Sequence, residues 1–130
     1  MKILVGYDGS KTAMDALKLA RKHAKALNAT VYVVTSMVGR EREGAEKVEQ
    51  AEKALDFARE VLAENGVACE THLLIRGLEP GEDIIQYAKE NDIDEIYIGV
   101  KRRSNLSKIV FGSNARNIII EAHCPVMTVK

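Results

Sequence analysis

Residues 94–130 read DEIYIGVKRRSNLSKIVFGSNARNIIIEAHCPVMTVK, and this stretch decides the fold. Its first apolar run, residues 96–98, predicts a buried strand that stops at Gly99. A basic polar loop follows, and Gly112-Ser113 opens a segment with helical periodicity before a last apolar run, Val126–Val129, predicts a closing strand. Free N–H groups at a helix start carry the positive end of the helix dipole. Strand, loop and helix together therefore predict a site for an anion such as a phosphate.

The preceding part of the chain alternates short β-rich runs with longer segments of helical periodicity. Thr12, with Asp15 three residues later, predicts a capping box at the start of the first helix. Asn28 predicts the end of that helix, and Pro80 predicts the first turn of the third. The expected strands before the last two cover residues 2–7, 29–37 and 67–75, and the expected second helix covers residues 45–65.

This order, β-α-β-α-β-α-β-α-β, predicts an α/β fold in one domain, residues 1–130. Each crossover is long enough for parallel pairing, and right-handed crossovers place helices on both faces of a doubly wound five-stranded sheet. In a strand order of 3-2-1-4-5, the ends of the first and fourth strands are neighbours where the order reverses, which is where such folds bind ligands. Asp8-Gly9-Ser10 follows the first strand and Gly99 ends the fourth.

Composition excludes several classes of function. Nineteen acidic and nineteen basic side chains leave no formal net charge, so the overall balance favours neither nucleic acid nor a membrane surface as partner. Cys69 and Cys124 lack metal-ligand spacing, and the three histidines have no partner at the spacing of a metal or nucleophile site. No cleavable signal and no apolar run near 18 residues is present, so we expect a cytoplasmic protein.

The spacing Gly99-x-x-Arg102, then nine residues, then Gly112-Ser113 resembles the nucleotide motif G-x-x-G-x9-G-(S/T) of the universal stress protein family. Residues 5–10 (VGYDGS) and 124–129 (CPVMTV) resemble that family's opening and closing strands. The resemblance covers essentially the whole chain. It implies a fold of the adenine nucleotide alpha hydrolase type and a homodimer joined through Val126–Val129. In one subclass it also implies bound ATP or AMP, with or without Mg²⁺; another subclass does not retain nucleotide.

Arg102 stands where the family motif has its second glycine. Glycine there would permit a positive φ or a close approach of the backbone to phosphate. The planar guanidinium of arginine binds phosphate oxygens well, so a side-chain contact is one interpretation. The other is that Arg102 fills the loop and leaves it empty.

The resemblance assigns a role to each part of the predicted nucleotide site. Asp8 would accept hydrogen bonds from the ribose hydroxyls, whereas the structural alternative is an Asx-turn formed by Asp-Gly-Ser. Val33 or Val34 would contact adenine, whereas the alternative for either residue is a plain core position. The loop and the following helix start would bind phosphate. The complete set of predicted site residues is Asp8, Gly9, Ser10, Val34, Gly99, Lys101, Arg102, Ser104, Gly112, Ser113 and Asn114.

Three functions follow from these patterns. The leading hypothesis is a nucleotide-dependent stress-response and signalling module that binds ATP or AMP between the first and fourth strands. The alternative is a dimeric interaction protein that binds no nucleotide. A slow ATPase ranks third, because Asp8 is the only acid placed near the site and no general base is evident.

Overall fold

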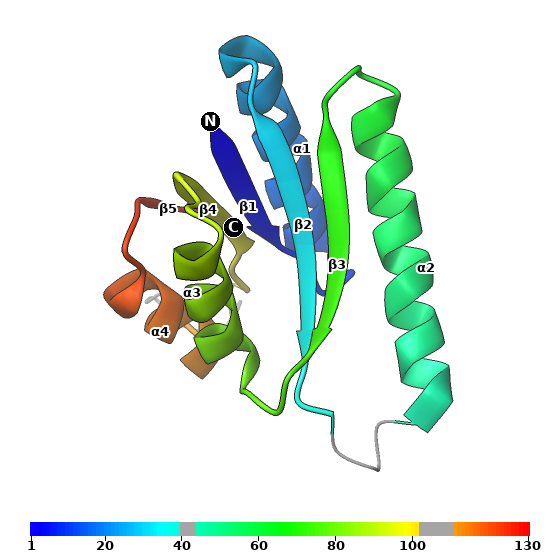
Figure 1. The fold of residues 1–130 in the computed structure, drawn as a ribbon, viewed down its shortest axis with the longest axis vertical. Helices are drawn as coiled ribbons and strands as arrows, with labels where there is room; N and C mark the ends of the chain where they lie inside the picture. The colour runs from blue at the N-terminus through cyan, green and yellow to red at the C-terminus, as the bar shows by residue number, and fades with distance from the viewer. Residues whose placement is uncertain (40–43, 102–110) are drawn as a thin grey trace.

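The structure, a computed structural model, describes residues 1–39, 44–101 and 111–130. Strands and helices alternate along these ranges (Figure 1). The strands are β1 (Lys2–Gly6), β2 (Thr30–Met37), β3 (Cys69–Ile75), β4 (Glu95–Gly99) and β5 (Val126–Val129). The helices are α1 (Lys11–Leu27), α2 (Gly44–Ala63), α3 (Pro80–Glu90) and α4 (Ser113–Glu121).

The five strands form one parallel sheet in the order β3-β2-β1-β4-β5, which confirms the predicted fold class. The order reverses at β1, which pairs with β2 on one side and β4 on the other. At its last residue Gly6 pairs with Val34 and with Ile98. The carboxyl ends of β1, β2 and β4 therefore meet at the switch point, where doubly wound sheets bind ligands.

Helices cover the sheet on two faces, α1 and α2 on one and α3 and α4 on the other (Figure 1). Ile3 and Val5 pack against the first pair of helices, whereas the intervening Leu4 packs against the second pair. The central strands are apolar on both sides because both of their faces are buried. Among the described helices, none is long and apolar enough to cross a bilayer.

The predicted start of the first helix was wrong by two residues. Ser10, not Thr12, is the N-cap of α1, and its hydroxyl accepts a hydrogen bond from the Ala13 amide at 3.2 Å. Gly9 has a φ of +80°, and the Asp8 carboxylate accepts from the Ser10 amide at 2.9 Å, so the chain turns before Thr12 is reached. Two other boundaries were correct: Asn28 ends α1 in the left-handed conformation, and Pro80 occupies the first turn of α3.

Candidate functional site

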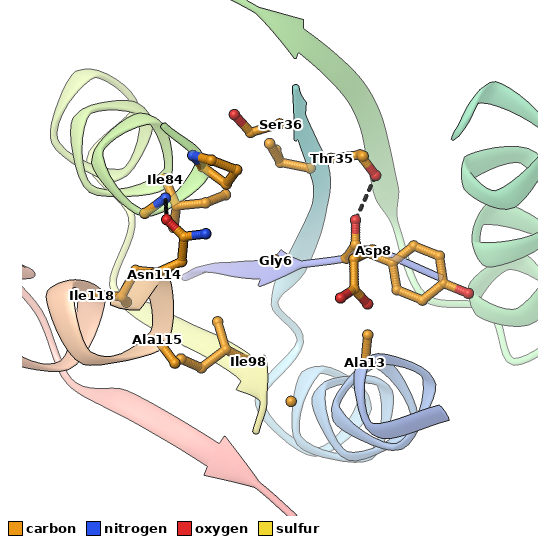
Figure 2. A pocket seen from close by; sticks show the side chains of 15 residues that line it. Gly6, Asp8, Ala13, Thr35, Ser36, Ile84, Ile98, Asn114, Ala115 and Ile118 are labelled. Atoms are coloured by element: carbon orange, nitrogen blue, oxygen red, sulfur yellow. Dashed lines mark hydrogen bonds between the residues drawn. The ribbon is translucent and has the colours of Figure 1, made fainter. Parts of the chain in front are cut away.

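A cavity of about 230 Å³ opens at the carboxyl ends of β1, β2 and β4 (Figure 2). A single water molecule needs only about 10–15 Å³ of such space, so the cavity has room for an organic ligand. Its walls come from three strand ends and from helices α1, α3 and α4. The lining residues are Gly6, Tyr7, Asp8, Ala13, Val34, Thr35, Ser36, Pro80, Gly81, Ile84, Ile98, Gly99, Asn114, Ala115 and Ile118.

The first turns of three helices converge on this cavity. Ala13 belongs to the start of α1, Pro80 and Gly81 to the start of α3, and Asn114 and Ala115 to the start of α4. Backbone N–H groups at helix starts carry partial positive charge. The cavity is therefore electrically suited to an anion, although the overall charge of the chain is zero.

Gly99 is a glycine because β4 ends against the start of α1. A Cβ atom at this position would lie 2.4 Å from the carbonyl carbon of Thr12 and 2.6 Å from the Ala13 amide nitrogen. These are backbone atoms, so no side-chain rotation could relieve the contact. The close approach of strand and helix accounts for Gly99 whether or not a ligand is bound beside it.

Asp8 forms the Asx-turn that was the structural alternative for this residue. Its Oδ1 accepts from the Ser10 amide, and Figure 2 shows its carboxylate directed toward the first turn of α1 near Ala13. An ionised carboxylate has about four acceptor positions, so one turn bond leaves further capacity. Asp8 can therefore hold its turn and accept hydrogen bonds from a ligand in the cavity at the same time.

Asn114 links the starts of two helices. Its Oδ1 accepts from the Gly81 amide at 2.9 Å and so caps α3, whose own N-cap residue makes no side-chain cap bond. A Cβ atom at Gly81 would lie 3.0 Å from the Asn114 backbone, so glycine permits this close packing. Because an N–H donor must meet the amide oxygen, the amide nitrogen points the other way, toward the cavity in Figure 2. Asn114 thus offers a donor to a ligand.

The end of β2 presents main-chain groups beyond the end of β1. The carbonyl of Val34 accepts from the Tyr7 amide at 2.9 Å, and the Thr35 hydroxyl donates to the Tyr7 carbonyl at 2.6 Å. Main-chain groups alternate in direction along a strand, so those of Ser36 point the same way as those of Val34. Ser36 lies past the last paired residue of β1, and its N–H and C=O therefore extend toward the cavity that it lines.

Behind Ser36 lies a buried ion pair that joins three segments of the fold. Asp83 of α3 has no solvent exposure, and its carboxylate accepts from Ser36 Oγ at 2.6 Å and from Arg76 Nε at 2.7 Å. Arg76 also binds Glu90 at 2.9 Å. Burial opposes the charge of Arg76, but its hydrogen bonds to Glu90 and Asp83 outweigh that cost and raise its pKa.

The cavity contains four of the predicted site residues: Asp8, Val34, Gly99 and Asn114. The other predicted residues that the structure describes lie outside its lining. Gly9 and Ser10 form the turn into α1, Gly112 is the N-cap of α4, and Lys101 is exposed after β4. Ser113 lines a separate shallow hollow on α4. Arg102 and Ser104 fall outside the described residues.

Sequence reasoning missed the contribution of α3 and of the end of β2. Pro80-Gly81 at a helix start was the available signal for the first, because only a small residue lets a second helix approach so closely. Nothing in the local pattern indicated that Asp83, in the first turn of α3, is buried beneath Ser36. In residues 1–39, 44–101 and 111–130, no group of three or more His, Cys, Asp or Glu is arranged to hold a metal ion.

Comparison with known proteins gives a consistent result. A profile of the universal stress protein family matches residues 1–130. A universal stress protein of Methanocaldococcus jannaschii is 33% identical over 140 residues, which span 99% of this chain and 81% of that protein.

Two solved structures of universal stress proteins from Archaeoglobus fulgidus superpose over the whole chain. The first is 37% identical, with a TM-score of 0.90, and 93% of it is covered. The second, a complex with dAMP, is 36% identical, with a TM-score of 0.87, and 98% of it is covered.

Proposed function

The chain belongs to the universal stress protein family, and on this premise we propose that it binds an adenine nucleotide, AMP or ATP, in the switch-point cavity. One observation carries the proposal: the cavity combines three converging helix starts with the carboxylate of Asp8. Such a site suits a ligand with both a phosphate and a sugar. The similar Archaeoglobus fulgidus protein in complex with dAMP supports the nucleotide class. In the cell this binding would serve a nucleotide-dependent response to stress.

The phosphates would lie at the loop that joins β4 to α4. Both ends of this loop are anchored at the cavity, since Gly99 and Asn114 line it. A Cβ atom at Gly112, the N-cap of α4, would meet no atom of residues 1–39, 44–101 or 111–130 within 4 Å, which leaves room for a ligand on the side of these residues. The remaining predicted phosphate contacts are the cationic and hydroxyl side chains Lys101, Arg102, Ser104 and Ser113.

The sugar and base would extend from the loop toward the ends of β1 and β2. Asp8 accepts from the ribose hydroxyls with the capacity that its turn bond leaves free. The base reaches Ser36, whose N–H and C=O form a donor and an acceptor side by side. A purine edge with one acceptor and one donor matches this pair. The apolar side chains of Ile84 and Ile98 also line the cavity.

Titration calorimetry of nucleotide-free protein with AMP and ATP tests the proposal. We expect binding by the natural chain and at least about tenfold weaker binding after Gly112→Val or Asp8→Asn. Asparagine can keep the turn bond to Ser10, so Asp8→Asn removes the charge without removing the turn. Asp15→Asn makes the same charge change on α1 outside the cavity lining and is the matched control.

Stability gives an independent measure of the same binding. A ligand at 100 times its Kd stabilises the folded state by about 2.7 kcal/mol. No heat of binding together with no rise in Tm at millimolar AMP or ATP would refute the proposal.

The second candidate function, dimeric interaction, rests on β5. This strand is the edge of the sheet, and Met127 on it and Ile120 on α4 are exposed to 38% and 62%. An edge strand with apolar neighbours favours pairing with a second chain. We therefore propose a homodimer through Val126–Val129. This dimer is compatible with nucleotide binding, and it would be the function of the protein if the cavity bound no nucleotide.

A proline substitution tests this dimer because β5 presents alternate residues to its outer edge. The carbonyls of Pro125 and Val129 bind β4, so the main-chain groups of Thr128 point outward. Thr128→Pro should remove an outward donor and give a monomer by analytical ultracentrifugation. The main-chain groups of Met127 face β4, so Met127→Pro should instead lower the stability of the fold. A natural chain that sediments as a monomer at all concentrations would exclude the dimer.

A further inference from the structure

The buried carboxylate of Asp83 has a place in the fold that capping or surface charge does not explain. It lies in the first turn of α3 with no solvent exposure, yet it accepts hydrogen bonds from the ends of two different strands. Ser36 Oγ of β2 binds one of its oxygens at 2.6 Å. Arg76, directly after β3, binds the other through Nε at 2.7 Å and Nη2 at 2.5 Å. Two strand ends and a helix start are thereby tied at one point.

This point lies immediately behind the wall of the cavity. Ser36 lines the cavity, and Figure 2 shows its side chain turned away from the cavity centre on the side of α3. The hydroxyl of Ser36 has a single proton, and that proton is donated to Asp83. The charge-assisted bond restrains the side chain, and the restraint extends to the main chain of the same residue.

We propose that Asp83 is a positioning residue that acts through Ser36 to select adenine over guanine. This inference rests on the proposed function. Asp83 itself does not touch the ligand. It holds the N–H and C=O of Ser36 at one place along the edge of the base, and the guanidinium of Arg76, bound to the other oxygen, orients the carboxylate.

Selection depends on position because a peptide N–H and C=O can match either purine. Adenine offers N1 as an acceptor and its 6-amino group as a donor, whereas guanine offers N1–H as a donor and O6 as an acceptor. The two bases therefore fit the same pair of main-chain groups only at different lateral positions. A base anchored at its ribose cannot shift freely, so a rigidly held Ser36 accepts one base and rejects the other. Without the restraint, the end of β2 can adjust to both.

The test measures the affinity of the protein for three ligands: AMP, GMP and ribose 5-phosphate. For the natural chain we expect AMP to bind at least about tenfold more tightly than GMP. Ser36→Ala and Asp83→Asn should reduce the ratio of the AMP affinity to the GMP affinity by about tenfold, mainly because AMP binds more weakly. The affinity for ribose 5-phosphate should change less than about twofold. A general loss of structure would instead weaken the binding of all three ligands together.

Glu90→Gln is the matched control, because it removes the exposed charge that pairs with Arg76 and leaves the bond between Asp83 and Ser36 in place. It should retain the ratio of the natural chain. If Asp83→Asn fails to fold, Ser36→Ala decides the matter, since it removes the same bond without touching the ion pair. A natural chain that binds no nucleotide refutes the proposed function. Two outcomes would refute only the positioning role. One is that the natural chain binds AMP and GMP with nearly equal affinity. The other is that folded Ser36→Ala keeps the preference for AMP of the natural chain.

Discussion

Replacement of Gly99 by alanine should destabilise the fold even when no ligand is present. The added Cβ would lie 2.4 Å from the carbonyl carbon of Thr12 and 2.6 Å from both the Thr12 oxygen and the Ala13 nitrogen. Relief requires β4 and the start of α1 to move apart, because all three atoms belong to the backbone. Overpacking of this kind costs about 1–3 kcal/mol, and we expect about 3 kcal/mol here. In a chain of this size that corresponds to a fall in Tm of roughly 10 °C.

Urea unfolding followed by circular dichroism, together with calorimetric melting, measures this loss. Gly112→Ala is the matched control, because the other glycine that this chain retains from the motif has a φ of −63° and no atom of the described residues within 4 Å of an added Cβ. It should cost less than about 1 kcal/mol, as expected for alanine at an N-cap without a side-chain cap bond. If Gly99→Ala lost no more stability than Gly112→Ala, the close approach of β4 to α1 would not be the reason for glycine at position 99.

Two further predictions concern buried ionisable groups. Arg76→Met should destabilise the protein by about 3–5 kcal/mol in urea unfolding, because it leaves the buried Asp83 carboxylate without its cation. The double variant Arg76→Met with Asp83→Leu should recover most of that loss. An Arg76→Met variant as stable as the natural chain would contradict this prediction. Burial, with the nearby charge of Glu70, raises the pKa of Tyr87 from 10.0 to about 12. The stability that the fold gains from keeping this hydroxyl neutral is therefore complete below pH 10 and is lost as the pH rises toward 12. The loss is roughly 2–3 kcal/mol, because each pKa unit corresponds to about 1.4 kcal/mol. Tyr87→Phe should flatten this alkaline decline in stability, and an unchanged decline would show that another group causes it.

Most of the predicted elements agree with the structure because a local pattern carried the information. The closing strand Val126–Val129 was predicted with its observed bounds, and Asn28 ends α1 as expected. The strand order 3-2-1-4-5 was expected together with the fold that the family resemblance implies, and the structure confirms it. The first helix start was wrong because two residue types compete as caps. Thr12 with Asp15 has the capping-box pattern, but the turn at Asp8 and Gly9 places Ser10 first.

The candidate site was predicted less completely than the fold. Asp8, Val34, Gly99 and Asn114 were expected from the family resemblance, and the structure brings them to one cavity. Asn114 was expected as a ligand contact, and its bond to Gly81 of α3 was not foreseen. Neither was the placement of Ser36 over Asp83. These residues carry no pattern of their own, because serine at a strand end and aspartate in a first helical turn are common for other reasons.

The sequence by itself determined which segments form strands and helices and that the sheet is parallel. These features depend on residues a few positions apart, or on rules that hold for all crossovers of this length. Only the tertiary structure decided what surrounds the switch point. The bond between Gly81 and Asn114 spans 33 positions and that between Ser36 and Asp83 spans 47. Such contacts depend on how α3 packs against α4 and the sheet, and packing is set by the shapes of all the side chains together.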